Sequence, residues 1–227
     1  PPLFARYIPG MQFGAHMERH VRHGLTPATE ILLYDAHRVV PRIEEFLRAK
    51  CKAERAEAAG DYRRRADVIR ELSFVVEAHN FERLVKTFQS FGGRTGLMRA
   101  DQASANFQLP SGVNVQVVNT STRLWGLSLL LATGSEAHLR KLMAMGYDVA
   151  ALTNGKTSCR TEDIVYQKLG LPLIPAELRE GHDEIERAAA ARLPDLVSGA
   201  DIRGELHAHT TSSDGVHTIE QMAAAAK

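Results

Sequence analysis

Residues 60–76, GDYRRRADVIRELSFVV, lead from an arginine-rich turn into a short apolar strand. Leu72 and Phe74 lie two residues apart, a period that predicts a β-strand with one buried face. Because alternate residues of a strand share a face, Glu71 and Ser73 should project together from the opposite side. The stretch therefore predicts a sheet that presents polar side chains near the start of one strand.

The flanking segments predict helices and further strands around this one. Apolar residues recur at helical spacing over residues 31–47, and Pro41 should divide this segment into two helices or kink it. Residues 80–91 predict another helix. Residues 106–109 and 113–118 predict two strands joined by a Pro-Ser-Gly turn, which is a strong hairpin signal. This mixture favours an α+β or α/β fold.

The C-terminal third is expected to be mainly helical. Turn-forming residues over 153–158 separate the sheet region from a helix over residues 162–169. A second helix is predicted over residues 183–193, and a linker from Gly199 leads to a strand over residues 202–209.

Composition sets broad limits on the protein. The chain has 227 residues, of which 44% are hydrophobic, enough for one substantial core or two small ones. Its formal charge of +1 supplies no general basic field, so contact with nucleic acid would depend on local arginine and lysine clusters. Cys51 and Cys159 form no paired motif, and no apolar run is long enough to cross a bilayer. We expect a soluble cytoplasmic protein.

The two ends of the sequence both suggest a fragment. Residue 1 is Pro rather than Met, and the final helical pattern is still continuing at Lys227. Near the N-terminus, Gly10 and Gly14 lie in a Pro-Gly turn before a helix, where free backbone N–H groups could hold a phosphate. This segment resembles the hairpin of a helix-hairpin-helix element. An ordinary turn between two helices explains it equally well.

Four segments together resemble the bacterial family X DNA polymerases. Residues 60–76 are similar to the family's signature of a Gly-Ser turn, two arginines and an acidic strand, and residues 133–138, TGSEAH, resemble its Thr-Gly-Ser turn. Residues 169–180, LGLPLIPAELRE, are very close to the thumb segment of bacterial members. Residues 201–215, DIRGELHAHTTSSDG, resemble the opening of the polymerase and histidinol phosphatase (PHP) domain. The resemblance extends from about Leu32 to the C-terminus.

This resemblance implies an α+β architecture with four parts. Residues 1–30 would be a helical fingers segment, 31–150 a nucleotidyltransferase palm, and 151–197 a small thumb. Residues 198–227 would be a linker followed by the first strand and helix of a metal-dependent PHP (β/α) barrel. The implied role is DNA repair, with gapped or single-stranded DNA as partner and a nucleoid-associated location. The sequence does not indicate an oligomeric state.

The polymerase site departs from the family at its metal-binding positions. The family holds two Mg²⁺ or Mn²⁺ ions with three aspartates, and Glu71, Ser73 and Gln116 occupy the matching positions here. Three negative charges have become one, and magnesium gains little from a hydroxyl or a neutral amide. We therefore expect these three residues to be non-functional as a catalytic site.

The matching nucleotide-binding positions are Gly60, Asp61, Arg63 and Arg64, with Thr133, Gly134 and Ser135 in the later turn. Asp61 replaces the family's serine where the triphosphate would lie, so its charge should repel a dNTP. For the arginines, contact with phosphate or the DNA backbone competes with a second interpretation as a solvated charge cluster. The palm is expected to transfer nucleotides poorly or not at all.

The start of the PHP domain retains its metal-binding residues. His207 and His209 are two apart on the predicted strand, so both imidazoles can chelate one metal, and Asp214 follows in a Ser-Asp-Gly turn. In the family this domain binds Mn or Zn and has 3′ to 5′ exonuclease activity. Only three candidate ligands are present, and the others would lie beyond Lys227.

Three other functions are compatible with the sequence. Glu71 with manganese could sustain a gap-filling polymerase. The palm and thumb could instead be a non-enzymatic scaffold that positions DNA for the nuclease. A small-molecule phosphatase of the histidinol phosphate type would also use such a metal strand, but the thumb segment argues against it.

Overall fold

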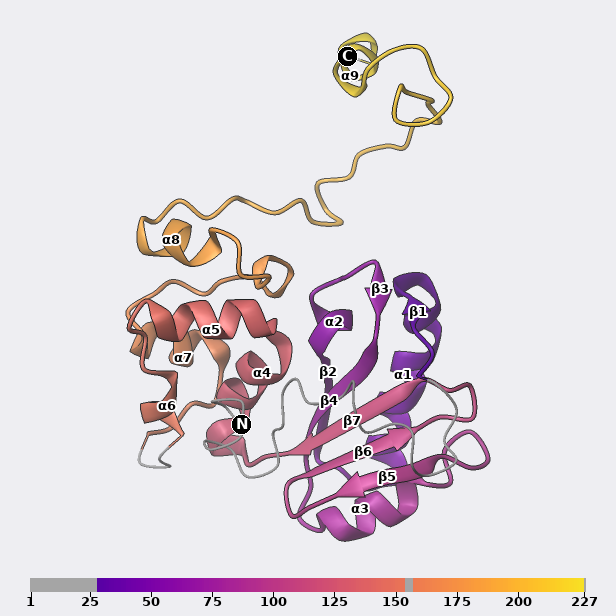
Figure 1. Cartoon of the computed structure of the whole chain (residues 1–227), viewed down its shortest axis with the longest axis vertical. Coiled ribbons are helices and arrows are strands. Elements are labelled where there is room, and N and C mark those ends of the chain that lie inside the picture. The colour runs from indigo at the N-terminus through magenta and orange to yellow at the C-terminus, as the bar shows by residue number, and fades with distance from the viewer. Residues whose placement is uncertain (1–27, 154–156, 227) are drawn as a thin grey trace. The chain divides into compact units, whose positions relative to one another are not determined.

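The structure is a computed structural model that describes residues 28–153 and 157–226 (Figure 1). The chain divides into two compact units, the first ending at Leu193 and the second beginning at Pro194. In the described residues of the first unit, a sheet region (residues 31–119) is followed by a helical region (residues 122–189). No helix in the described part of the chain is both long and apolar enough to cross a membrane.

A five-stranded mixed sheet forms the centre of the sheet region. Its strand order is β2-β4-β7-β6-β5, with β4 and β7 parallel and the other neighbours antiparallel. A separate two-stranded ribbon pairs β1 with β3. The strands are β1 (Ile31–Leu32), β2 (Arg55–Ala59), β3 (Val68–Ile69), β4 (Glu71–Glu77), β5 (Gly96–Ala100), β6 (Ser104–Gln108) and β7 (Asn114–Asn119).

Nine α-helices lie in the described residues. Three belong to the sheet region, five to the helical region and one to the second unit. They are α1 (Leu33–Ala49), α2 (Gly60–Arg63), α3 (Phe81–Phe88), α4 (Trp125–Thr133), α5 (Glu136–Ala144), α6 (Val149–Leu152), α7 (Glu162–Lys168), α8 (Glu184–Ala189) and α9 (Ile219–Ala225).

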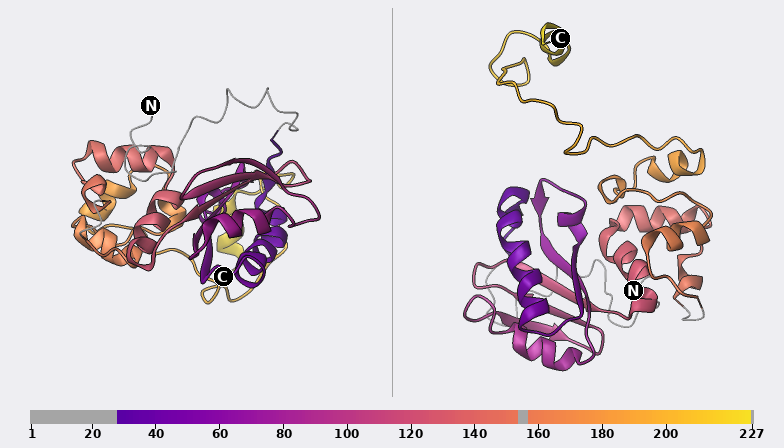
Figure 2. Two further views of the ribbon diagram at one scale, coloured as in Figure 1. Left: turned by 90° about the horizontal axis from the view of Figure 1, so that it is seen from below. Right: turned by 180° about the vertical axis from the view of Figure 1, so that it is seen from behind.

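One hydrophobic core lies between the sheet and helices α1 and α3. Leu72 and Phe74 of β4 enter this core together with Ile43 of α1. The ring of Phe88 in α3 meets that of Phe107 in β6 edge-on, with centroids 4.8 Å apart. Helices α1 and α3 lie on the same side of the sheet (Figure 2). This face of β4 is used for packing, which leaves the alternate residues for the opposite face.

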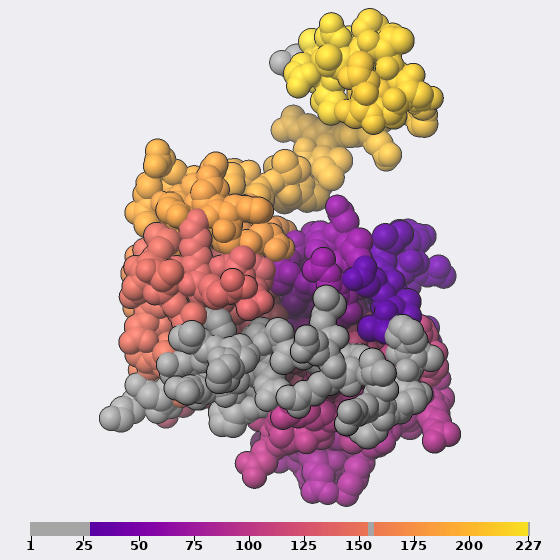
Figure 3. All heavy atoms as spheres, in the orientation of Figure 1, coloured from indigo at the N-terminus to yellow at the C-terminus, as the bar shows by residue number. Residues whose placement is uncertain are grey.

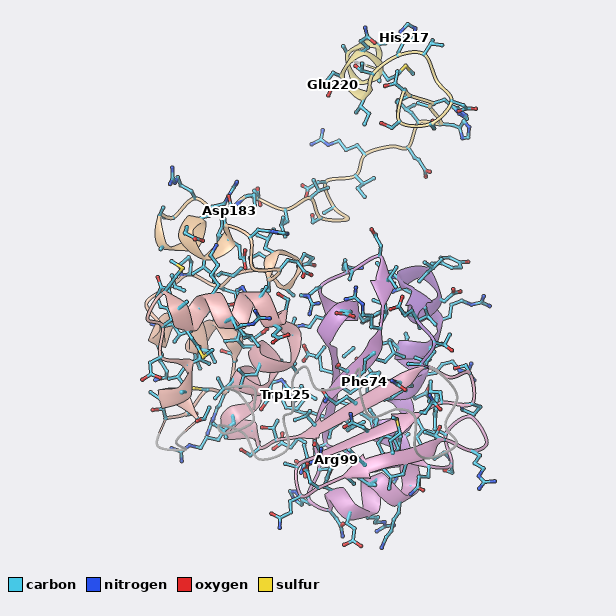
Figure 4. All side chains as sticks on the ribbon, viewed as in Figure 1. Phe74, Arg99, Trp125, Asp183, His217 and Glu220 are labelled. Atoms are coloured by element: carbon cyan, nitrogen blue, oxygen red, sulfur yellow. The ribbon has the colours of Figure 1, made fainter. Side chains whose placement is uncertain are left out.

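A second core joins the other face of the sheet to the helical region. Val75 and Val118 enter it from β4 and β7. Helix α4 is buried along its whole length, which explains why its sequence lacks a polar face, and Trp125 at its start belongs to this core (Figure 4). The core also includes residues of α5, α7 and α8, so the predicted palm–thumb boundary at residue 150 falls inside one hydrophobic cluster.

The structure confirms most predicted elements and corrects one. Of the two alternatives for residues 31–47, the structure has a single helix, α1, with Pro41 inside it, and not two helices. Its buried stripe, which includes Ala36, Val40 and Ile43, runs unbroken past the proline and holds both halves against the sheet. The predicted hairpin is present, with Gln108 of β6 opposite Asn114 of β7.

The predicted strand over residues 202–209 was wrong, because this segment is irregular and exposed. A strand is stable only when its backbone groups pair with a neighbour, and no strand is found in the described residues of the second unit. That unit contains α9, whose start carries a capping box formed by Thr218 and Gln221.

Candidate functional site

The register between β4 and β7 brings the predicted polar positions together. Ser73 lies opposite Gln116, and Glu71 lies opposite Asn114 in the parallel pairing. We call Glu71, Ser73 and Gln116 the strand platform. Val75, two residues beyond Ser73 on β4, packs against the helical region, which places the platform on the face opposite α1 and α3.

The strand platform has little capacity for divalent cations. Burial, together with the nearby charge of Asp61, raises the pKa of Glu71 to about 7. Within the described residues, no donor bonds to the Glu71 carboxylate, and Ser73 and Gln116 supply only neutral oxygens. Mg²⁺ and Mn²⁺ favour charged oxygen ligands, so one half-protonated carboxylate does not fit a two-metal site.

Gly60 fits closely against this platform. Its φ of +62° lies in the left-handed region, and a Cβ placed there would be 2.9 Å from Ser73 Oγ. Glycine is therefore required both by the backbone conformation and by the approach of β4. The first residue of α2 is therefore held directly beside Ser73, which matches the family's second strand aspartate.

Arg64, predicted as a phosphate contact, is bound within the protein. Its Nη2 donates to Asp61 Oδ1 at 2.6 Å, its Nε to Glu180 Oε1 at 2.7 Å and its Nη1 to the Thr133 carbonyl at 2.6 Å. The other Asp61 oxygen accepts the backbone N–H of Arg70 at 3.2 Å. These bonds connect α2 with the end of α4 and with the loop before α8.

Arg63 makes a second set of internal bonds, centred on Glu162 of α7. Its Nη1 and Nη2 donate to Glu162 Oε1 and Oε2 at 2.9 and 2.6 Å. Arg179, whose side chain is 1% exposed, donates to the same Oε1 at 2.5 Å and to the Ile174 carbonyl. Burial alone would raise the pKa of Glu162, but the two guanidinium groups lower it. This triad joins the sheet region to the helical region.

The Thr133-Gly134-Ser135 turn contacts both arginines. Thr133 Oγ1 accepts from Arg63 at 3.2 Å, while the Thr133 carbonyl accepts from Arg64. Ser135 caps α5 by accepting the His138 backbone N–H. The structure thus brings the two predicted nucleotide-binding segments side by side, with their polar groups bonded to the protein itself.

The three predicted PHP ligands lie together in the second unit. His207 Nε2 is 3.1 Å from His209 Nε2, and His209 Nδ1 is 2.5 Å from Asp214 Oδ1. Gly215 permits this approach, since a Cβ there would lie 2.4 Å from the His209 carbonyl carbon. The hydrogen bond to His209 lowers the pKa of Asp214.

His209 uses different ring nitrogens toward its two neighbours, so the three side chains do not converge on one point in this arrangement. In the described part of the chain, no group of three or more His, Cys, Asp or Glu is arranged to hold a metal ion. Imidazole and carboxylate are nevertheless suitable donors for Mn or Zn. Metal binding at His207, His209 and Asp214 stays a prediction.

Some site residues were missed from the sequence, and others cannot be assessed. Glu162 and Glu180 lie 99 and 116 residues from their arginine partners, and no local pattern pairs such distant residues. Glu162 directly follows the helix cap Thr161, where an acidic residue normally indicates only a helix start. Gly10 and Gly14 lie outside the described residues.

Comparison with known proteins gives one distant relative to consider. No family model matches the chain. The chain is 24% identical over 204 residues to the DNA polymerase/3′-5′ exonuclease PolX of Bacillus subtilis (strain 168). The match covers 84% of this chain and 35% of PolX, so the chain spans about a third of its relative. This similarity supports a distant family X relationship.

Proposed function

We propose that this chain is the palm and thumb of a family X type DNA-repair protein whose palm no longer transfers nucleotides. The similarity to PolX supports the DNA-directed role. One observation carries the loss of transfer. The strand platform keeps the register of a metal-binding sheet, yet Glu71 is its one carboxylate and has a pKa raised to about 7.

The surroundings of the strand platform support the same conclusion. Nucleotidyl transfer requires cations to neutralise the triphosphate and to activate the attacking hydroxyl. Arg63 and Arg64 could supply part of the positive charge that the missing cations would bring to the triphosphate. Both guanidinium groups, however, are bound to carboxylates within the protein. Asp61, which pairs with Arg64, adds a negative charge beside these arginines.

Primer extension on gapped DNA tests this proposal. We expect no incorporation above background with Mg²⁺ or Mn²⁺, and the same background in Glu71→Gln. Glu45→Gln on the exposed face of α1 is the matched control, because it removes one carboxylate away from the platform. Incorporation that Glu71→Gln abolishes and Glu45→Gln preserves would show a working manganese- or magnesium-dependent polymerase.

We further propose that nuclease activity belongs to the PHP segment. His207, His209 and Asp214 would hold a Mn or Zn ion, which can lower the pKa of a bound water and polarise a phosphodiester. In the protein with its PHP domain, 3′ to 5′ shortening of a labelled strand should need added metal and be lost in His207→Ala and Asp214→Ala. Shortening that both variants retain would assign the activity elsewhere.

A further inference from the structure

His138 of α5 is a histidine whose side chain is completely buried, where α5 meets α7 and α8 (Figure 1). Its Nδ1 is 2.6 Å from Oε1 of Glu184, the first residue of α8. Its Nε2 is 3.4 Å from the hydroxyl oxygen of Tyr166 in α7. Because an ionised carboxylate can only accept hydrogen bonds, Nδ1 carries the proton and Nε2 accepts from Tyr166. The neutral imidazole thereby has a partner at both ring nitrogens.

Glu184 depends on this contact to stay ionised away from water. Its side chain is 4% exposed, and Oε1 also accepts the backbone N–H of Gly181 at 2.8 Å. Its Oε2 is buried, and no donor in the described residues bonds to it. Burial alone would raise the pKa of Glu184, but the hydrogen bonds from His138 and from backbone N–H groups lower it. His138 therefore supplies a buried hydrogen bond that fastens the start of α8 to α5.

Residues 180–189, which we call the α8 latch, pack directly on α5. A Cβ on Gly181 would lie 2.6 Å from the Cβ of Ala137, so the backbone of the latch touches the first turn of α5. A second ion pair across this contact joins Lys141 to Glu186 at 2.8 Å, but both side chains are partly exposed. The second unit of the chain begins shortly after the latch. The contact between the latch and α5 thus lies where the first unit ends.

The charged groups that face His138 favour its neutral form. Burial has the largest effect and lowers the pKa of His138, and the cations Arg179 and Arg64 act in the same direction, while Glu184 opposes them. Burial raises the pKa of Tyr166, so its hydroxyl keeps its proton at neutral and acidic pH. A proton added to the imidazole would be a buried positive charge near two guanidinium groups. In water the same imidazole has a pKa of 6.5.

We propose that protonation of His138 releases the α8 latch from α5, so that this contact responds to pH just below neutrality. The closed latch keeps the imidazole neutral, whereas the open latch exposes it to water, where it takes up a proton. The open state therefore binds more protons below pH 6.5. Closure is fully favoured above this pH and weakens as the pH falls below it. The inference concerns the helical region and does not depend on the proposed loss of nucleotide transfer.

Hydrogen exchange of backbone amides in the whole chain, followed by mass spectrometry and corrected for the intrinsic effect of pH, tests this proposal. In the wild type, the opening equilibrium constant of residues 180–189 should rise from about pH 7.5 to about pH 5.5, by at most about tenfold because one proton is taken up. The constant for α3 should not change, since α3 contains no histidine and lies in the other core. An unchanged constant at the latch, or an equal rise in α3, would overturn the proposal.

Two substitutions remove the titrating group and keep a hydrogen-bonding side chain. His138→Asn places an amide near the position of Nδ1, and His138→Gln places one near Nε2. Opening of the latch should be independent of pH in each variant that folds. If neither folds, the comparison of the latch with α3 in the wild type decides.

His79→Gln is the matched control for these variants. It removes an imidazole whose side chain is 89% exposed and which lies 3.2 Å from Glu54, and it should keep the wild-type rise. A rise that persists in a folded His138 variant, or one that disappears in His79→Gln, would overturn the proposal.

Discussion

The strand platform and the ion-pair triad of Arg63, Glu162 and Arg179 lie in the same unit, but the pKa of the carboxylate is shifted in opposite directions in the two sites. The platform has a single carboxylate, with no hydrogen-bond donor to it in the described residues, and burial raises its pKa. In the triad, Glu162 lies between Arg63 and Arg179, and its pKa is lowered. Glu162 is nearly buried, whereas Glu71 is partly buried. A carboxylate that is shielded from water stays ionised when arginines lie beside it, as at Glu162. Without such neighbours, as at Glu71, it protonates more readily.

The packing of the first unit shows what Arg63 and Arg64 hold together. Figure 3 shows the atoms of the helical region, in salmon and orange, against the purple atoms near α2. Arg63 and Arg64 extend from α2 into this contact and bond to residues of α4, α7 and the loop before α8. These arginines therefore join the sheet region to the helical region, whether or not the platform transfers nucleotides.

Removing the central carboxylate of the triad should produce the largest effect. Glu162→Gln leaves the buried Arg179 without its carboxylate and leaves Arg63 with only its longer pair to Glu57 at 3.6 Å. Breaking such a buried pair costs about 3–5 kcal/mol. Urea unfolding measures this loss. Glu82→Gln, which breaks an exposed ion pair with Lys86 on α3, is the control and should leave the midpoint unchanged. Equal stability of Glu162→Gln and wild type would show that the triad does not hold the regions together.

A smaller loss is expected at the contact between α2 and the platform. Gly60→Ala combines a left-handed φ with a Cβ 2.9 Å from Ser73 Oγ, so it should destabilise by about 2–4 kcal/mol. Gly170→Ala separates the two causes, because Gly170 has a φ of +74° but no atom within 4 Å of the added Cβ. Thermal unfolding should show a larger loss for Gly60→Ala. Equal losses would mean that Ser73 does not crowd this position.

Sequence patterns identified the sheet region because its signals are local. The alternation of Leu72 and Phe74 indicated β4, and the turn residues after β6 indicated the hairpin. Strand β2 was missed because its sequence, RAEAA, has no β-branched or aromatic residue; it is a strand because it pairs with β4. The opposite error occurred at residues 202–209, where a local strand pattern lacks a partner.

Only part of the candidate site was predicted, because the sequence shows local patterns but not contacts between distant residues. The resemblance placed Gln116 on the strand next to Glu71 and Ser73, and the structure pairs Gln116 with Ser73 in the parallel register. The sequence also identified the arginines but not their partners, since the bonds of Arg63 and Arg64 depend on how α7 and the loop at Glu180 pack. Charge neutralisation between distant residues arises from tertiary structure and leaves no periodic signal.

The pH dependence of stability should distinguish the platform from the triad. The pKa of Glu71 rises from 4.5 to about 7 on folding, so the folded state holds this proton more tightly than the unfolded state. Its stabilising effect is full below pH 4.5 and is lost as the pH rises through 7. Relative to Glu71→Gln, the wild type should lose about 1–3 kcal/mol across this range. A pH-independent difference in unfolding free energy would contradict the raised pKa.

The smallest effect is expected at Arg65, the third arginine of the run. Its side chain is 60% exposed and lies 3.7 Å from Glu177, unlike the two arginines before it. Arg65→Gln should change the unfolding free energy by less than about 0.5 kcal/mol, as is usual for exposed pairs. A loss in urea unfolding comparable to that of Glu162→Gln would show that position in the run, rather than pairing with buried carboxylates, determines the importance of these arginines.

Counting the Mn²⁺ ions bound by the platform tests the central claim most directly. Electron paramagnetic resonance titration should use the His207→Ala/His209→Ala variant, so that ions at the PHP segment do not contribute. We predict no saturable Mn²⁺ binding, and the same titration curve after adding Glu71→Gln. Two ions bound per chain, both lost with Glu71→Gln, would contradict the conclusion that this platform cannot gather the cations that nucleotidyl transfer requires.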